Sequence, residues 1–191
     1  MSHFRYINKK LFAEKVSVST IIKKNKTPFY LYSEKQLKEN YSNFIKNFKN
    51  VNPLICFATK ANTNLAILRT LGKLGAGADV VSGGELLKAI KAGIKPNKIV
   101  FSGVGKTEEE LRLAIKKKIL LINIESESEA VLINKIAKKH NQKVSVGFRL
   151  NPDVDAKTHK KISTGKAENK FGLSIANFSI FYKNIKKFNN L

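Results

Sequence analysis

The sequence contains no tryptophan and only one cysteine and one methionine among its 191 residues. The single cysteine, Cys56, excludes an internal disulfide and any zinc site built from cysteines. No apolar run reaches the ~18 residues that a membrane-spanning helix requires. Residues 1–10 are polar and basic and lack the apolar centre of a secretory signal. These absences predict a soluble, cytoplasmic protein.

Acidic residues are also scarce, with 14 against 36 basic residues and a formal net charge of +22. Such a charge raises the question of a nucleic acid or an anionic membrane as partner. The lysines, however, recur along the whole chain and fall mostly near the ends of predicted helices, where solvated lysines are common. A genome rich in lysine and asparagine codons would explain the composition. We therefore expect neither partner, and a basic nucleic-acid-binding module is an alternative that rests on charge alone.

Apolar residues make up 42% of the chain, enough for a globular domain with a core. Short apolar runs alternate with helical patterns, which is typical of βαβ units and a mainly parallel sheet. The predicted strands are 54–58, 77–82, 98–102, 119–124 and 144–150, and the predicted helices are 65–74, 85–92, 108–117, 128–140 and 175–188.

A different pattern precedes this alternation. Phe29–Tyr32 follows Pro28 as a short aromatic run and predicts a strand. A helical pattern then begins at Ser33, and Ser33 and Gln36 have the spacing of a capping box. We expect residues 1–33 to form an N-terminal segment that precedes one domain over 34–191.

Polar residues gather at the carboxyl ends of the predicted strands. The alternation fits an open doubly wound sheet or a closed (β/α)8 barrel, and this distribution favours the barrel, whose active-site mouth lies at those ends. Only five strands follow Pro53, against the eight of a full barrel. We therefore expect an α/β fold: a partial TIM-like (β/α)8 barrel, truncated after about five βα units. The residues at the strand ends are Lys60, Asp79, Ser82, Ser102, Glu125, Ser126, Arg149 and Asn151.

Lys60 follows the apolar run 54–59. Burial beside such a strand lowers the pKa of a lysine and favours its nucleophilic amine, which can condense with an aldehyde such as that of pyridoxal phosphate. A lysine snorkelling at a strand end is the competing interpretation. Local spacing alone favours the snorkelling lysine.

Asp79 and Glu85 flank the run Val80–Gly84. Glu85 begins a predicted helix, where a carboxylate is a routine partner of the helix dipole. Asp79 lies in an apolar strand, and a buried carboxylate needs a partner. A cationic cofactor adduct or Lys60 itself would serve.

Arg149 lies in an apolar strand and must be paired there. It either steadies an anionic oxygen or carboxylate at the mouth, or forms an ion pair that closes the barrel. Residues 151–159 then form a polar turn that contains His159. No second histidine accompanies His159 at metal-ligand spacing, so we expect no metal site. The run Gly103–Thr107 lacks the first glycine of a phosphate loop, so it is weak evidence for a nucleotide.

Together these segments resemble the diaminopimelate decarboxylases, a family of the alanine-racemase-like (group IV decarboxylase) class of pyridoxal-phosphate enzymes. The resemblance is collinear from about Thr27 to Ile175. Its most specific part is the long run from Phe148 to Gly172, which relatives acting on ornithine, arginine or carboxynorspermidine do not share. The other matching segments are 27–32, 58–62, 79–86, 101–106 and 122–126.

The resemblance implies that Lys60 holds pyridoxal 5'-phosphate as a Schiff base, and that Asp79, Arg149 and Glu85 line the cofactor pocket. It implies decarboxylation of meso-2,6-diaminopimelate to L-lysine by a cytoplasmic homodimer. It also implies that the N-terminal segment carries a strand belonging to the C-terminal β domain of the full enzyme.

The lysine motif of the family reads Tyr-Ala-Val-Lys-Ala-Asn, whereas Phe57 and Thr59 replace the tyrosine and valine here. The family also continues into a histidine strand, a glycine-rich phosphate loop and a β domain beyond the 191 residues. We therefore expect little activity from this chain alone. A non-catalytic pyridoxal-phosphate-binding barrel and a decarboxylase of ornithine, arginine or carboxynorspermidine are the alternatives.

Overall fold

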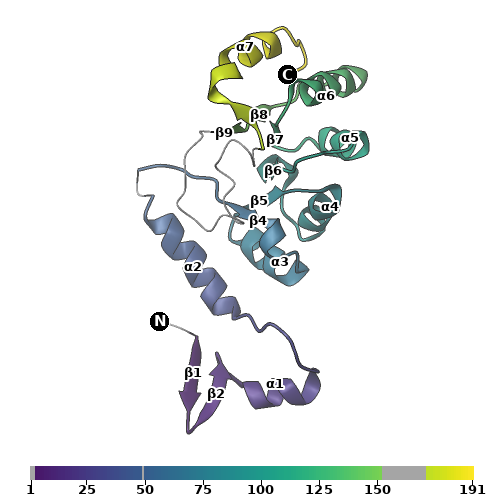
Figure 1. Cartoon of the computed structure of the whole chain (residues 1–191). Helices are drawn as coiled ribbons and strands as arrows, with labels where there is room; N and C mark the ends of the chain where they lie inside the picture. The colour runs from purple at the N-terminus through teal and green to yellow at the C-terminus, as the bar shows by residue number, and fades with distance from the viewer. Residues whose placement is uncertain (1–2, 49, 152–170) are drawn as a thin grey trace.

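A computed structural model describes residues 3–48, 50–151 and 171–191. The chain begins with a small antiparallel sheet in the order β1-β2-β3, formed by Phe4–Ile7, Lys10–Ala13 and Val16–Ser17. Asn8 and Lys9 both have positive φ, which suits the two-residue turn between β1 and β2. Helix α1 (Val18–Lys24) follows, and this N-terminal unit lies at the opposite end of the molecule from α7 (Figure 1).

The strand predicted for Phe29–Tyr32 is wrong. These residues form an irregular connection between α1 and α2 (Glu34–Lys46), and the Tyr30 side chain is almost fully exposed. A strand needs a neighbour to accept its hydrogen bonds, and this run pairs with no strand among the described residues. The predicted start of the helix is confirmed, because the Ser33 hydroxyl accepts the Gln36 backbone N–H at 3.1 Å.

Five parallel strands form the main sheet in the order β4-β5-β6-β7-β8. Their bounds are Cys56–Ala58, Gly77–Val80, Ile99–Phe101, Leu121–Ile124 and Val146–Phe148. Each strand pairs with the next one in sequence, whereas a doubly wound sheet reverses its order at a switch point. The predicted barrel-type arrangement is therefore confirmed.

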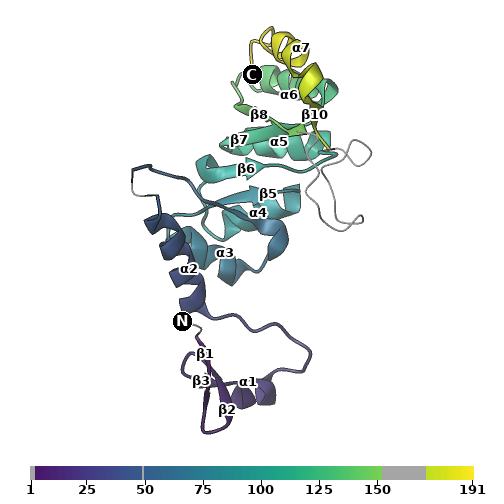
Figure 2. The ribbon, with the colours of Figure 1, turned by 60° about the vertical axis from the view of Figure 1, so that its left-hand side comes forward.

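Helices cover one face of this sheet (Figures 1 and 2). They are α3 (Leu65–Lys73), α4 (Gly83–Lys91), α5 (Glu108–Lys117) and α6 (Glu127–Lys139). Because side chains alternate along a strand, every second residue points at the helices. These strand residues are fully buried and form the core with Leu86, Leu111 and Ile133: Ala78, Val80, Ile99, Phe101, Ile122 and Ile124.

The chain ends against the last strand of the sheet. Strands β9 (Leu150–Asn151) and β10 (Leu173–Ser174) pair in parallel, and α7 (Ile175–Ile185) follows. Phe148 of β8 packs edge-on against Phe181 of α7, with ring centroids 5.4 Å apart. The polar turn with His159 and the greater part of the most specific matching run lie outside the described residues.

Candidate active site at the carboxyl ends of the parallel strands

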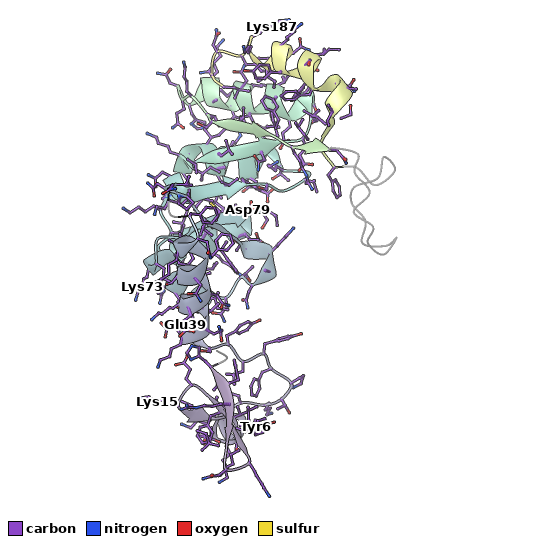
Figure 3. All side chains as sticks on the ribbon, turned by 90° about the vertical axis from the view of Figure 1, so that its left-hand side faces the viewer. Tyr6, Lys15, Glu39, Lys73, Asp79 and Lys187 are labelled. Atoms are coloured by element: carbon purple, nitrogen blue, oxygen red, sulfur yellow. The ribbon has the colours of Figure 1, made fainter. Side chains whose placement is uncertain are left out.

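The second face of the main sheet, which we call the inner face, carries the alternate residues of each strand. The strand register places Ala58 beside Asp79, and Asn123 beside Gly147. Because the core residues of the same strands point at the helices, these residues point the other way. Figure 3 shows Asp79 well away from Tyr6 and Lys15 of the N-terminal unit. The candidate site is thus made by the main sheet.

Lys60 lies at the mouth of this face. It is in the short 3-10 turn Thr59–Ala61, two residues beyond Ala58 at the end of β4. The expected desolvation of Lys60 is wrong, because the turn carries its side chain out of the sheet and leaves it exposed. The residue that the turn buries is Thr59, whose hydroxyl oxygen has no hydrogen-bond partner among the described residues.

Asp79 lies one strand away from Lys60. Its Oδ1 is buried and has no hydrogen-bond partner in the described part of the chain. A buried carboxylate oxygen costs free energy until a cation or a hydrogen-bond donor reaches it. The position of Asp79 in an apolar strand predicts that its carboxylate needs a partner, and within the described residues its Oδ1 has none.

Cys56 shares the inner face with Asp79. Burial raises the pKa of the Cys56 thiol, and the negative charge of Asp79 raises it further. A Cβ at Gly77 would lie 2.8 Å from the Cys56 sulfur and 2.2 Å from the Lys98 carbonyl oxygen. Glycine at 77 therefore leaves the room that the thiol occupies.

A neutral hydrogen bond crosses the next pair of strands. The Asn123 side-chain amide donates to the Ser102 hydroxyl at 2.9 Å. A Cβ at Gly147 would lie 2.4 Å from Asn123 Oδ1, so glycine is required where this amide lies against β8. Ser102 and Asn123 form the polar floor between the Asp79 and Arg149 ends of the inner face.

Arg149 forms an ion pair on the inner face. Its Nη1 lies 2.9 Å from Glu125 Oε1, and the Arg149 and Glu125 side chains are 41% and 12% exposed. Its guanidinium also lies over the Phe171 ring, 5.4 Å from the centroid. A guanidinium has five N–H donors, and within the described residues Glu125 is its only ion-pair partner. The ion pair predicted as one alternative is present, and donors remain for an anion.

Glu85 stabilises the start of its own helix, α4. Its backbone N–H donates to the Ser82 hydroxyl at 3.2 Å, and its carboxylate accepts the Val81 backbone N–H at 2.9 Å. Ser126 and Glu129 repeat the arrangement at the start of α6, where Glu129 accepts from the Glu125 N–H. Ser82 and Ser126 are therefore helix caps, and Glu85 performs the helix-start role that was the simpler alternative.

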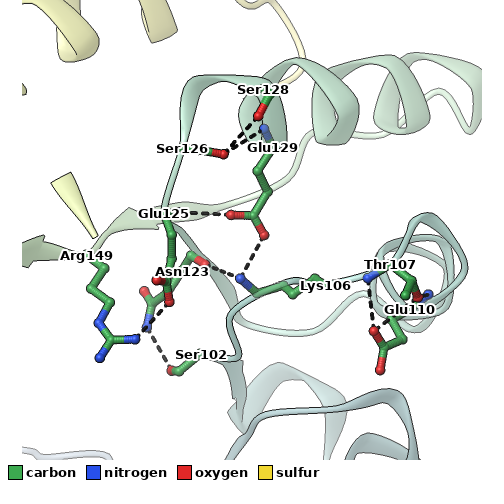
Figure 4. A network of polar contacts seen from close by, with 10 residues as sticks. All are labelled: Ser102, Lys106, Thr107, Glu110, Asn123, Glu125, Ser126, Ser128, Glu129 and Arg149. Atoms are coloured by element: carbon green, nitrogen blue, oxygen red, sulfur yellow. Dashed lines mark hydrogen bonds and ion pairs between the residues drawn. The ribbon is translucent and has the colours of Figure 1, made fainter. Parts of the chain in front are cut away.

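Lys106 is a residue whose importance was missed in the sequence. Its side chain is 1% exposed, and its ammonium donates to the Glu129 carboxylate at 2.8 Å and to the Asn123 carbonyl at 2.7 Å (Figure 4). Thr107 caps α5 in a capping box with Glu110. The phosphate-loop interpretation of 103–107 is therefore excluded, because Lys106 is buried and paired.

A barrel-type sheet that has, in its described residues, an exposed lysine and a buried carboxylate oxygen without a partner at neighbouring strand ends is the framework of an enzyme domain for a small molecule. The family model of the pyridoxal-dependent decarboxylases, in its pyridoxal binding domain, matches residues 34–191. The chain belongs to this family.

Its relatives point to one branch of that family. The chain is 45% identical to the diaminopimelate decarboxylase of Aquifex aeolicus over 189 residues, which are 99% of this chain and 44% of that protein. It is 53% identical over 148 residues to that of Helicobacter pylori strain J99, covering 78% and 36%. The chain thus spans less than half the length of these relatives.

Solved structures agree with this fold. The diaminopimelate decarboxylase of M. jannaschii in complex with L-lysine matches with a TM-score of 0.89 and 40% identity, over 98% of this chain and 45% of that one. The arginine decarboxylase of Paramecium bursaria Chlorella virus matches with a TM-score of 0.71 at 22% identity, which shows a shared fold alone.

The residues of the inner face fit the aldehyde end of pyridoxal phosphate, the cofactor of this family. An aldehyde needs an accessible amine, and Lys60 is exposed. A cationic adduct needs a counter-charge, and Asp79 Oδ1 is buried without a partner in the described chain. Across residues 3–48, 50–151 and 171–191, no group of three His, Cys, Asp or Glu side chains could hold a metal ion, and no helix is long and apolar enough to cross a membrane.

Proposed function

We propose that the chain forms the lysine-bearing side of the active site in an enzyme that decarboxylates meso-2,6-diaminopimelate to L-lysine. The observation that carries the proposal is the position of two residues at neighbouring strand ends: Lys60 is exposed just beyond Ala58, and Asp79, the register partner of Ala58, has a buried Oδ1 without a hydrogen-bond partner in the described residues. Supporting it, the curated relatives that match the chain at 41–53% identity bear the name of that enzyme.

When bound, pyridoxal phosphate supplies an aldehyde for an amine and an electron-accepting ring for the carbanion left by carbon dioxide. Lys60 provides the amine. Its exposure lets it approach the aldehyde and later give way to a substrate amine. Asp79 holds positive charge at this end of the inner face, because its oxygen gains a partner only when a cation or donor arrives.

Arg149 binds the negative end of a ligand at the other side of the mouth. Glu125 fixes the guanidinium through one nitrogen, and the exposed remainder faces solvent. A carboxylate or a phosphate oxygen matches the geometry of that fork. Lys60 and Arg149 would thus hold opposite ends of one bound molecule.

Further parts of the proposal concern organisation. Residues 1–33 form an N-terminal segment that joins a C-terminal β domain, and 34–191 form the barrel domain. The boundary is supported by the start of α2 at Glu34 and by the antiparallel character of the sheet that precedes it. A cytoplasmic homodimer is the assembly we propose.

The covalent role of Lys60 is tested by trapping. The chain is incubated with pyridoxal phosphate, reduced with borohydride and digested, and the modified lysine is located by mass spectrometry. We expect the label on Lys60, its loss in Lys60→Ala, and its retention in Lys88→Ala, a change at an exposed lysine of α4. Labelling spread evenly over the surface lysines would contradict a dedicated site.

The substrate is tested in a chimera. This chain replaces the N-terminal part of the Aquifex aeolicus relative that it matches, and carbon dioxide release is measured with diaminopimelate, ornithine and arginine. We expect release from diaminopimelate, lowered at least ~10³-fold by Lys60→Ala because the nucleophile is gone. A preference for ornithine or arginine would assign the chain to another decarboxylase.

A further inference from the structure

We propose that Lys106 and Glu129 are positioning residues, which set the direction of Glu125 and, through it, of Arg149. The inference deepens the proposed function, because Arg149 is the anion-binding group of that proposal. Lys106 and Glu129 lie behind the inner face and have no contact with Arg149 themselves (Figure 4). They would act on Arg149 through the backbone at the end of β7, which they hold at Asn123 and Glu125.

The first step is the burial of Lys106. Its ammonium is surrounded by the Glu129 carboxylate, the Asn123 carbonyl and the ring of Phe101, whose centroid is 5.7 Å away. A buried ion pair of this kind adds little stability over apolar side chains of the same volume. What it supplies is a fixed arrangement, because a buried charge tolerates few alternative geometries.

The second step connects this pair to the site. Glu129 uses one carboxylate oxygen for Lys106 and the other for the Glu125 backbone N–H at 2.8 Å. Lys106 in turn holds the Asn123 carbonyl. The backbone is therefore held on both sides of Ile124, which fixes the direction in which the Glu125 side chain leaves the strand. The Glu125 carboxylate then accepts the hydrogen bond from the Arg149 guanidinium and so orients it.

The third step is a comparison within the chain. Glu85 at the start of α4 has the same arrangement as Glu129 at the start of α6: its carboxylate accepts the backbone N–H of Val81, the residue before the helix cap. Yet Glu85 has no lysine or arginine within ion-pair distance in the described residues. Val81, which its carboxylate holds, is apolar, whereas the residue held by Glu129 is the charged Glu125. The additional lysine thus occurs where the strand end presents a charged group of the candidate site.

Amide hydrogen exchange of the chain tests the proposal without any ligand. In Lys106→Met, we expect exchange at the Glu125 and Arg149 amides to become about tenfold faster, while the equivalent Val81 amide keeps its rate. Lys106→Arg retains the charge and should restore slow exchange at Glu125. Lys138→Met, on the exposed surface of α6, should change none of the three.

Equal acceleration at Val81 and Glu125, or none at Glu125, would overturn the proposal in favour of a general packing role. If Lys106→Met does not fold, Glu129→Gln gives the same comparison, because its amide oxygen still accepts the Glu125 N–H but loses the ion pair. The expected result is then faster exchange at Glu125 with Val81 again unchanged.

Cofactor binding separates this inference from the proposed function. Lys106→Met should raise the dissociation constant for pyridoxal phosphate about tenfold. In a chain that already carries Arg149→Met, the same change should hardly raise it further, because Lys106 acts only through Arg149. The same loss in both backgrounds would show that Lys106 does not act through Arg149. If the unaltered chain does not bind pyridoxal phosphate, the proposed function fails, and the exchange rates still decide the positioning role.

Discussion

The guanidinium of Arg149 and the carboxylate of Glu125 meet 2.9 Å apart and join the ends of β8 and β7 on the inner face. The Arg149 backbone N–H also donates to the Ile124 carbonyl at 3.1 Å, so a backbone hydrogen bond and a side-chain ion pair both join these two strand ends. Glu125 is the more buried partner, and its orientation is set from behind by its backbone N–H contact with Glu129.

Removing Arg149 is expected to destabilise the chain. Arg149→Met leaves the partly buried Glu125 carboxylate without its cation, which should lower the free energy of unfolding by about 1–2 kcal/mol. Urea denaturation at pH 7 measures the change. Arg112→Met is the matched control, since it breaks the exposed pair with Glu108 within α5 and should cost at most about 0.5 kcal/mol. Equal losses would contradict the burial argument.

Gly147→Ala is expected to disturb the floor of the inner face. The new Cβ would lie 2.4 Å from Asn123 Oδ1, so the amide must leave its contact with Ser102. We expect a loss of about 1–3 kcal/mol in the free energy of unfolding. Asn123→Ala should relieve much of it in the double variant. Gly84→Ala is the control, because its Cβ would meet only ordinary contact, and little or no loss is expected.

The reactivity of Cys56 should report on Asp79. Burial first, and then the Asp79 charge, raises the pKa of the thiol, whereas Lys98 lowers it. The rate of alkylation should therefore have its midpoint at a higher pH than that of a free cysteine. Asp79→Asn removes a negative charge and should move the midpoint to lower pH. A midpoint unaffected by Asp79→Asn would show that the two groups do not interact.

Glu110 should make stability depend on pH in acid. The Gly83 and Thr107 backbone N–H groups donate to its carboxylate and lower its pKa from the ordinary 4.5. A lowered folded pKa gives stability that is complete above pH 4.5 and is lost as the pH falls through the folded value. Urea denaturation between pH 7 and 3 should show this loss, and Glu110→Gln should reduce it.

Glu109→Gln provides the reference for that series. Glu109 lies in the same first turn of α5 and has no hydrogen bond or ion pair among the described residues. Its replacement removes the same charge from the helix start without removing the contacts of Glu110. The acid dependence should therefore persist in Glu109→Gln, and its disappearance there would assign the effect to the helix dipole.

The alternation of strands and helices was predictable because each element has its own local pattern. The helix predicted over 108–117 coincides with α5, where Thr107 and Glu110 provide a capping box in the sequence. The N-terminal sheet and α1 were not predicted. Their strands are two to four residues long, and their outward residues mix polar and apolar types. Such short segments show no clear alternation of polar and apolar residues from which a strand could be predicted.

The candidate site was predicted in part. Asp79, Arg149 and Lys60 lie on or beside the inner face, but Lys60 is exposed where its apolar neighbours predicted burial. A 3-10 turn decides that outcome, and such turns have no strong sequence pattern. Lys106 was missed because its partners, Asn123 and Glu129, are distant in sequence. The serine–glutamate spacing at 82–85 and 126–129 is the signal that identifies these residues as helix caps.

The sequential order of β4 to β8 has a consequence for the way this sheet forms. Every strand finds its partner in the preceding βα unit, so the contacts that build the sheet join nearby parts of the chain. Each pairing closes one βα unit and needs no strand from a more distant part of the chain, although parallel pairing of this kind forms more slowly than the local contacts of a helical bundle. We expect the sheet to grow strand by strand in the direction of synthesis, with each new unit packing on one that has already emerged from the ribosome.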